Sequence, residues 1–216
     1  MTDYIAPASP RTVAIIGGHG KIALLAAREL SASGHTVLSV IRNPDQASDI
    51  TEAGGRPVVL DIETAEAGEL ADKIRGTDAI VFAAGAGGDG GADRKKTVDL
   101  GGSLKSIDAA KQLGVRRFLQ ISFQGADDAV ATEGDESWLA YHAAKKEADD
   151  ALRDSGLDYT IIRPGGLTDE PAGPVETGTD IAKGETSRGS VAAYIAAVID
   201  DEESVGAVVD IVDARG

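Results

Sequence analysis

The segment Thr12–Ala23, TVAIIGGHGKIA, constrains the fold of this 216-residue chain more than any other segment. Its first five residues form a short run of apolar and β-branched side chains, typical of a strand buried on both faces in a parallel sheet. Small residues follow at G-x-x-G-x-x-A spacing. Gly17 permits a tight turn, Gly20 permits close approach of the backbone to a phosphate group, and Ala23 lets a helix pack closely on the strand. The pattern predicts a strand–turn–helix unit.

The same alternation of apolar strands and amphipathic helices continues along the chain. Further strands are expected at Thr36–Ile41, Pro57–Leu60, Ala79–Ala83, Phe118–Ser122, Tyr159–Arg163 and Ala207–Val212. Helices are expected near residues 45–53, 65–75, 93–113, 137–155 and 190–200. Strands that alternate with helices build βαβ units, so the sequence predicts an α/β fold with a doubly wound, mainly parallel sheet.

Two segments depart from this alternation. Residues 1–10 lack any periodicity, which predicts a flexible leader ahead of a single domain over residues 11–216. Residues 165–189 combine Gly, Pro, Thr and Asp without an apolar period and are expected to form a long loop. Long loops in compact domains often act as lids or substrate loops, and a plain surface excursion is the alternative.

Composition excludes several functions. The chain has 21 Lys plus Arg against 36 Asp plus Glu, a net charge of −15 that disfavours nucleic-acid and anionic-membrane surfaces. It has no Cys, and its three His lack metal-ligand spacing, so no metal site is expected. No apolar run approaches the ~18 residues of a membrane span, and the first residues lack a signal-peptide pattern. We therefore expect a cytoplasmic monomer or homodimer that acts on a small molecule.

The turn after the first strand predicts a dinucleotide site. The free N–H groups and partial positive charge of a helix N-terminus attract phosphate. The residues expected to hold a pyrophosphate are Gly17, Gly18, His19, Gly20, Lys21 and Ile22. Glycines that serve the turn alone are the alternative.

The ends of the next strands suggest which dinucleotide binds. The second strand ends at Arg42 rather than at an acid, and a guanidinium pairs with the 2′-phosphate of NADP. NADP(H) is therefore favoured over NAD(H), with a solvated Arg42 as the alternative. Asp61 and Ile62 follow the third strand, where they are expected beside the adenine. Small residues follow the fourth strand, and they let a cofactor lie across the sheet edge: Ala83, Ala84 and Gly85.

Several motifs together resemble the short-chain dehydrogenase/reductase superfamily, and the best match is its atypical, epimerase-like branch of small NAD(P)-binding proteins. These motifs are the glycine turn, Ala83-Ala84-Gly85, Ser122, Tyr141-His-Ala-Ala-Lys145 and Arg163-Pro164-Gly165. The resemblance covers roughly residues 11–213. It implies a Rossmann-like sheet of seven strands with the cofactor along its C-terminal edge, and it adds Lys145, Pro164 and Gly165 to the cofactor contacts.

The resemblance also implies a catalytic Ser–Tyr–Lys group, matched here by Ser122, Tyr141 and Lys145. Asp99 stands where many relatives carry an assisting Asn, which puts the usual proton relay in doubt because an ionised acid cannot donate a hydrogen bond. Tyr141 and Lys145 share a helix face. The ammonium is expected to lower the pKa of Tyr141 toward the working pH, making Tyr141 the general acid in carbonyl reduction. Ser122 would then hold the carbonyl oxygen and Lys145 the nicotinamide ribose.

These features predict an NADP(H)-dependent oxidoreductase acting on a small carbonyl or quinone-like compound. A non-catalytic NADP(H)-binding redox sensor and an epimerase or dehydratase are the alternatives. The substrate pocket is expected near Phe123–Gln124 and the 165–189 segment, with Lys183 and Arg188 as its few basic groups. Trp138 is expected to pack in the interior, with a place in the pocket wall as the alternative. Two acidic pairs are expected to face solvent: Asp127-Asp128 and Asp149-Asp150.

Overall fold

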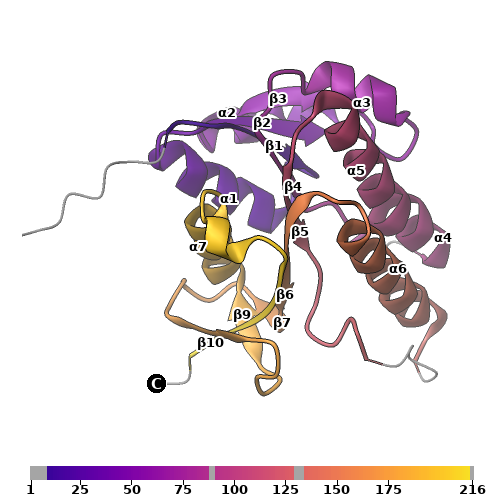
Figure 1. Ribbon diagram of the computed structural model, residues 1–216, viewed down its shortest axis with the longest axis vertical. Helices are drawn as coiled ribbons and strands as arrows, with labels where there is room; N and C mark the ends of the chain where they lie inside the picture. The colour runs from indigo at the N-terminus through magenta and orange to yellow at the C-terminus, as the bar shows by residue number, and fades with distance from the viewer. Residues whose placement is uncertain (1–8, 88–90, 129–133, 215–216) are drawn as a thin grey trace, which may run out of the picture.

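The computed structural model describes residues 9–87, 91–128 and 134–214, and it is built around one eight-stranded sheet (Figure 1). The strand order is β3-β2-β1-β4-β5-β6-β10-β8. The bounds are β1 Thr12–Ile16, β2 Thr36–Ile41, β3 Arg56–Val59, β4 Ala79–Phe82, β5 Arg117–Ile121, β6 Asp158–Pro164, β8 Val175–Gly178 and β10 Ala207–Asp213. All pairings are parallel except that of β8 with β10. The predicted α/β fold with a Rossmann-like, doubly wound sheet is confirmed.

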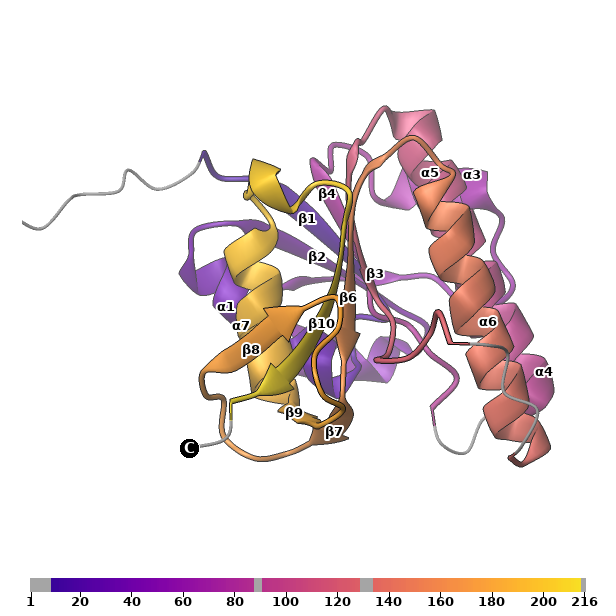
Figure 2. The same ribbon diagram turned by 60° about the horizontal axis from the view of Figure 1, so that its bottom comes forward.

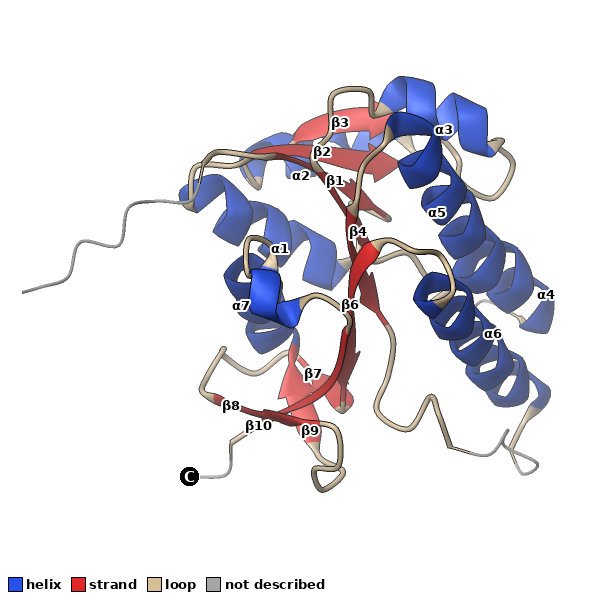
Figure 3. Ribbon diagram, viewed as in Figure 1, coloured by secondary structure: helices blue, strands red, loops and turns tan. Residues whose placement is uncertain are grey.

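Helices cover both faces of the sheet (Figure 3). One layer contains α1 (Lys21–Ala32) and α7 (Arg188–Val198), with α2 (Ala47–Glu52) beside α1. The other layer contains α3 (Ala67–Lys73), α5 (Gly101–Leu113) and α6 (Glu136–Arg153). Short helical turns complete the described elements: η1 Pro44–Gln46, α4 Ala92–Arg94, η2 Lys95–Leu100 and η3 Glu202–Ser204. None of the described helices is both long and apolar enough to cross a membrane.

The apolar run of β1 shows why the sheet needs two helical layers. Val13 and Ile15 face the core shared with α1 and α7, whereas Ala14 and Ile16 face the core shared with α3 and α5. All four are fully buried. A strand that is apolar on both sides must be covered on both sides, and only helices on both faces achieve this.

The glycine turn is held tightly against the neighbouring strands. Gly17 has φ +82°, and a Cβ added there would lie 2.5 Å from Ala84 Cα. A Cβ added to Gly18 would lie 2.6 Å from the Cβ of Ser39 on β2. A larger residue at either position would overlap the neighbouring strand, so both positions require glycine. The turn can therefore pack closely at the centre of the sheet's carboxyl edge.

Two regions differ from the sequence-based expectations. The helix expected at 93–113 is interrupted by the π-helical turn η2 between α4 and α5. The loop expected at 165–189 contains three short strands: β7 Gly166–Thr168, β8 and β9 Glu185–Ser187. Figure 2 shows β8 beside β10, where it adds an eighth, antiparallel strand to the sheet edge. Most of the leader expected at 1–10 lies outside the described residues.

Candidate functional site

A trough runs along the carboxyl edge of the sheet and consists of two adjoining cavities. The Arg42 cavity, about 270 Å³, lies beyond the ends of β2 and β3. The Tyr141 cavity, about 660 Å³, lies between α1, β5 and α6. Both are lined by Gly20, Ala83, Ala84, Gly85 and Gly87, so they meet over the end of β4. Cavities of this size accommodate small ligands and cofactors.

The N-terminus of α1 forms the wall of the trough near its middle. Gly20 is the N-cap residue and provides no side-chain cap, and the first turn of α1 contains no acid. The first-turn residues Lys21, Ile22 and Ala23 line the Tyr141 cavity. Their N–H groups lie where a helix has no internal acceptors, and the absence of a Cβ at Gly20 keeps the approach open. This cradle fits a diphosphate.

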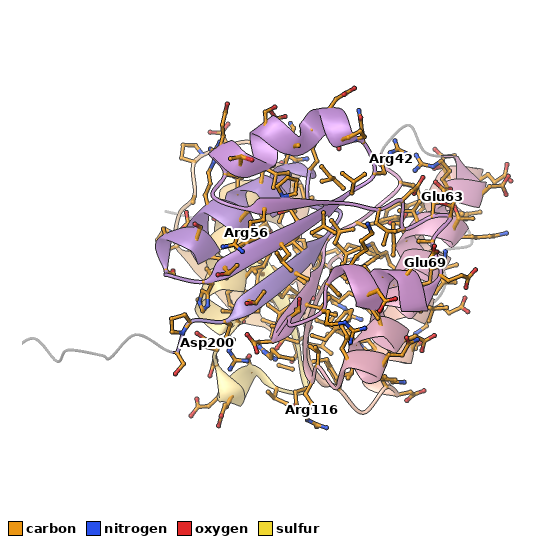
Figure 4. The ribbon with its side chains drawn as sticks, turned by 90° about the horizontal axis from the view of Figure 1, so that it is seen from above. Arg42, Arg56, Glu63, Glu69, Arg116 and Asp200 are labelled. Carbon is orange, nitrogen blue, oxygen red and sulfur yellow. The ribbon has the colours of Figure 1, made fainter. Side chains whose placement is uncertain are left out.

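The Arg42 cavity contains the groups that the sequence assigned to the adenosine end. Arg42 is exposed at the end of β2, and Figure 4 shows it at the same end of the molecule as Glu63, away from Arg116 and Asp200. Asp61 and Ile62 line this cavity, as expected from their place after β3. His19 also lines it, and its Nε2 lies 2.7 Å from Asp49 Oδ2. The side chain of His19 is thus held at the rim of the cavity by α2.

Tyr141 and Lys145 line the second cavity from one face of α6. The Lys145 Nζ donates to the backbone oxygen of Ile121 at 2.8 Å and lies 3.8 Å from Asp99 Oδ1. Burial lowers the pKa of Lys145, and the carboxylates of Asp99 and Asp149 oppose that shift. The ammonium is therefore held on the floor of the cavity by one hydrogen bond, to Ile121, and one ion pair, with Asp99.

The pKa of Tyr141 moves in the direction opposite to the one predicted. Burial raises it above its usual value, and the negative charges of Asp99 and Asp149 raise it further. The two carboxylates and the burial of the phenol outweigh the effect of the nearby ammonium, on which the expected lowering was based. In this structure the phenol is thus held in its protonated, hydrogen-donating form.

Asp99 connects the strand end to the floor of the cavity. Its Oδ2 accepts a hydrogen bond from the Ala86 N–H at 2.9 Å, and its Oδ1 faces Lys145. A Cβ at Gly85 would lie 3.1 Å from Asp99 Oδ1, so this glycine allows the carboxylate to approach. Both neighbours are donors. An acceptor-only carboxylate satisfies both, whereas an Asn amide would direct its NH₂ group at one of them.

Ser122 lines the cavity but is engaged on its far side. Its Oγ donates to Asp149 Oδ2 at 2.8 Å. Asp149 is fully buried and also accepts from Gln120 Nε2 and from the Arg163 guanidinium. The expectation that the Asp149-Asp150 pair faces solvent is therefore wrong for Asp149. The hydrogen of the Ser122 hydroxyl points to this carboxylate, which leaves its lone pairs for the cavity.

Two aromatic side chains, Trp138 and Tyr141, line the Tyr141 cavity, and Phe123, which is not among the lining residues, packs against both rings. The Phe123 ring lies 5.6 Å from the Trp138 ring and 5.2 Å from the Tyr141 ring, measured between centroids. Trp138 is 43% exposed and lines the cavity, as does the exposed Leu167 of β7. Trp138 therefore takes the alternative place in the wall, and a flat, apolar surface faces the cavity mouth.

Some predicted site residues lie away from the trough. Gly18 packs on Ser39, and Gly165 lies so close to the Gly184 carbonyl that a Cβ there would overlap it. Neither these two glycines nor the buried Pro164 is among the residues that line either cavity. Gln124 and Lys183, expected in the substrate pocket, contact other loop groups: Gln124 donates to the Ile181 and Ala182 carbonyls, and Lys183 pairs with Asp128. These residues shape the loops around the site.

The trough has a charge opposite to that of the chain. Six Lys and Arg line the described parts of the two cavities, against three Asp. The cations are Lys21, Arg42, Arg94, Lys95, Lys145 and Arg188, and the acids are Asp61, Asp99 and Asp135. A cationic groove in an acidic protein attracts an anionic ligand such as a dinucleotide. The described residues contain no group of three or more His, Asp or Glu that could hold a metal ion.

Sequence reasoning missed two residues at this site, Asp149 and Lys95. Asp149 is four residues beyond Lys145, so helical spacing could have placed it on the same face. Arg188, expected among the basic groups of the substrate pocket, follows β9, lines the Tyr141 cavity and pairs with Asp169, which also holds Lys21. No sequence signal distinguished the buried Lys95 from the exposed Lys96 beside it.

Comparisons with known proteins agree with this geometry. The chain matches the NAD(P)H-binding family over residues 17–202. It is 35% identical over 207 residues to the Bacillus subtilis protein YhfK, an "uncharacterized sugar epimerase", with 93% of this chain and 94% of YhfK covered.

Solved structures with similar sequences share the fold over nearly their whole length. One is described as a "putative NAD-dependent epimerase/dehydratase from Bacillus halodurans", at 33% identity, a TM-score of 0.87 and 94% coverage of both chains. Another is the oxidoreductase ylbE of Lactococcus lactis, at 26% identity and a TM-score of 0.83, with 94% of this chain and 91% of ylbE covered.

Proposed function

The chain belongs to the NAD(P)H-binding family, and on this premise we propose that it is an NADP(H)-dependent oxidoreductase that reduces a small, flat carbonyl or quinone-like compound. The observation that carries this proposal is the placement of Tyr141 and Lys145 on one cavity that Trp138 also lines and that is continuous with the glycine turn. A bound NADPH supplies the hydride in such a reaction.

Residues along the trough would hold the cofactor in a defined order. Gly17, Gly20 and the first turn of α1 suit the pyrophosphate, and Asp61 with Ile62 suits the adenine. Arg42 suits a 2′-phosphate, because it is a cation that lines this cavity. Among the described residues, no carboxylate forms an ion pair with it. Lys145 suits the nicotinamide ribose. These assignments support a preference for NADP(H).

The chain's own groups divide the proton chemistry among them. Tyr141 donates a hydrogen bond to the substrate oxygen and transfers its proton as negative charge develops there. Lys145, fixed by the Ile121 carbonyl and Asp99, stabilises the phenolate that remains. Ser122 offers lone pairs, so it accepts a hydrogen bond from Tyr141 or from the alcohol product rather than donating to a carbonyl. Trp138, backed by the Phe123 ring, excludes water and orients a flat substrate.

The raised pKa of Tyr141 favours reduction over epimerase chemistry. An epimerase begins by removing a proton from a substrate hydroxyl, which requires the phenolate as a base. Burial, Asp99 and Asp149 all disfavour that form. The names of YhfK and the Bacillus halodurans protein refer to epimerases, yet the electrostatics of this cavity suit an acid.

One observation favours a second function, that of an NADP(H)-binding redox sensor. The Ser122 hydroxyl is committed to Asp149, so it does not offer a second hydroxyl proton to a substrate oxygen beside that of Tyr141. In a sensor, Tyr141 and Lys145 would hold ribose alone.

NADPH consumption across a panel of quinones, flavins and aromatic aldehydes separates the two functions. The reductase proposal predicts turnover with at least one flat, conjugated compound, and this turnover falls in the Tyr141→Phe variant. Tight NADPH binding without turnover on any member of the panel would instead support the sensor.

A further inference from the structure

A second lysine faces the Tyr141 cavity and has no part in the chemistry described above. Lys95 begins η2, is only 7% exposed and lines the cavity together with Tyr141 and Lys145. Its Nζ lies 5.1 Å from the centre of the Tyr141 ring. A buried ammonium beside the reacting phenol demands an explanation, because removing such a charge from water is costly.

The described surroundings of Lys95 compensate its positive charge incompletely. The Nζ of Lys95 donates to the Gly87 carbonyl at 2.7 Å, and no described carboxylate lies within 4.0 Å of it. Lys145 nearby is different, because it has Asp99 as its counter-ion. The positive charge of Lys95 also contributes to lowering the pKa of Lys145, which shows that the two ammonium groups act on the same space.

The backbone at Lys95 directs this side chain to the Tyr141 cavity. The π-helical turn η2 places both Lys95 and Asp99 among its buried residues, on the side of the trough. Single π-helical turns inside α-helices frequently occur at functional sites. Lys96, the next residue, is exposed.

We propose that Lys95 binds an anionic group of the substrate, and that the substrate is a carboxylate-bearing aromatic or conjugated carbonyl compound. This inference rests on the proposed reductase function and specifies its substrate class. The carboxylate pairs with the Lys95 ammonium, the flat ring lies along Trp138, and the carbonyl oxygen receives the Tyr141 hydrogen bond. A carboxylate supplies the counter-charge that the described surroundings of Lys95 lack.

Trp138 provides a direct binding measurement, because it is the one Trp of the chain and lines the cavity. Quenching of its fluorescence is titrated with 4-carboxybenzaldehyde and with the methyl ester of that aldehyde, on protein saturated with NADP⁺. The two compounds share the ring and the aldehyde and differ in charge. We expect the acid to bind about ten- to hundredfold more tightly than the ester, the range for a charge-assisted hydrogen bond.

Three variants separate charge from structure. Lys95→Met removes the charge, Lys95→Gln keeps a donor for the Gly87 carbonyl without the charge, and Lys96→Met is the matched control. Both Lys95 variants are expected to lose the preference for the acid, whereas Lys96→Met keeps it. NADPH affinity is expected to change less than about threefold in all three.

Several results would overturn the inference. One is equal binding of acid and ester by the unmodified protein, and another is an acid preference that survives Lys95→Gln. A third is a loss of NADPH affinity as the main effect of the Lys95 variants, which would assign Lys95 to a cofactor phosphate. Turnover is measured in parallel. Acid-selective binding without NADPH oxidation would support the Lys95 site and refute the reductase function. Turnover without a preference for the acid would support the reductase function and refute the Lys95 site.

Discussion

The hydroxyl of Ser122 donates its hydrogen to the buried carboxylate of Asp149, with 2.8 Å between the two oxygens. Asp149 receives further hydrogen bonds from Gln120 and Arg163, so its negative charge is fixed beneath the cavity floor. This charge has two consequences for the site. It orients Ser122 as an acceptor, and it contributes to keeping Tyr141 protonated.

Ser122→Ala tests the orientation of this hydroxyl. Asp149 keeps its bonds to Gln120 and Arg163, so we expect a stability loss of about 1 kcal/mol and a loss of turnover below about tenfold. Ser103→Ala is the matched control, because Ser103 is a buried hydroxyl that donates to Gln120 away from the trough. Thermal denaturation and steady-state kinetics measure both effects. A hundredfold loss of turnover confined to Ser122→Ala would mean that Ser122 donates to the substrate.

Asp99→Asn tests the role of the carboxylate that replaces the usual amide. Removing its charge leaves the Lys145 ammonium with less compensation, so the pKa of Lys145 falls further. The alkaline limb of the pH–rate profile should therefore move to lower pH. Asp93→Asn, an exposed change of equal charge in α4, should leave the profile in place. An unmoved limb in Asp99→Asn would contradict this electrostatic role.

Arg42→Glu tests the cofactor preference. The substitution places a negative charge at the position assigned to the 2′-phosphate, so the ratio of NADP to NAD affinity should fall at least about tenfold. Arg56→Glu on the neighbouring strand β3 makes the same change of charge outside the trough, and Figure 4 shows Arg56 well separated from Arg42. Titration calorimetry with both cofactors gives the ratio. If the two variants alter it equally, the effect is one of overall charge.

The raised pKa of Tyr141 predicts opposite pH dependences for the two directions of reaction. Reduction uses the protonated phenol, so loss of the phenol proton should not lower its rate between about pH 6 and pH 9, below the ordinary Tyr value. Alcohol oxidation uses the phenolate, so its rate should rise with pH across the same range without reaching a plateau. Initial rates in both directions provide the comparison. A plateau in the oxidation rate near neutral pH would show that the bound cofactor reverses the upward shift of the Tyr141 pKa.

The sequence predicted the sheet well because seven of its eight strands are defined by local signals. The run Thr12–Ile16 is apolar throughout and is followed by glycines, and the structure places β1 at these residues. β8 was not predicted, since Val175–Gly178 has no apolar alternation and becomes a strand by pairing with the edge of β10. Its pairing depends on contacts distant in sequence, which periodicity cannot reveal.

The candidate site was predictable where one helix or one turn sets it. The i, i+4 spacing of Tyr141 and Lys145 brings both to one cavity. The state of Tyr141 was not predictable, because it depends on Asp99 and on the burial of Asp149, which belong to η2 and to a later turn of α6. The Asp149-Asp150 pair looks polar and solvated in the sequence. Only the packing of α6 on β5 and β6 shows that one of the two is buried.

The central claim, that the Tyr141 hydroxyl donates the proton in an NADPH-dependent reduction, is tested most directly by single-turnover NADPH oxidation in Tyr141→Phe. This change removes one oxygen and keeps the ring packed on Phe123. Tyr194→Phe, a half-buried phenol outside the trough, is the control. We predict that Tyr141→Phe oxidises NADPH about 10²–10⁴-fold more slowly, with the NADPH dissociation constant changed less than about threefold. Full activity in Tyr141→Phe would contradict the claim.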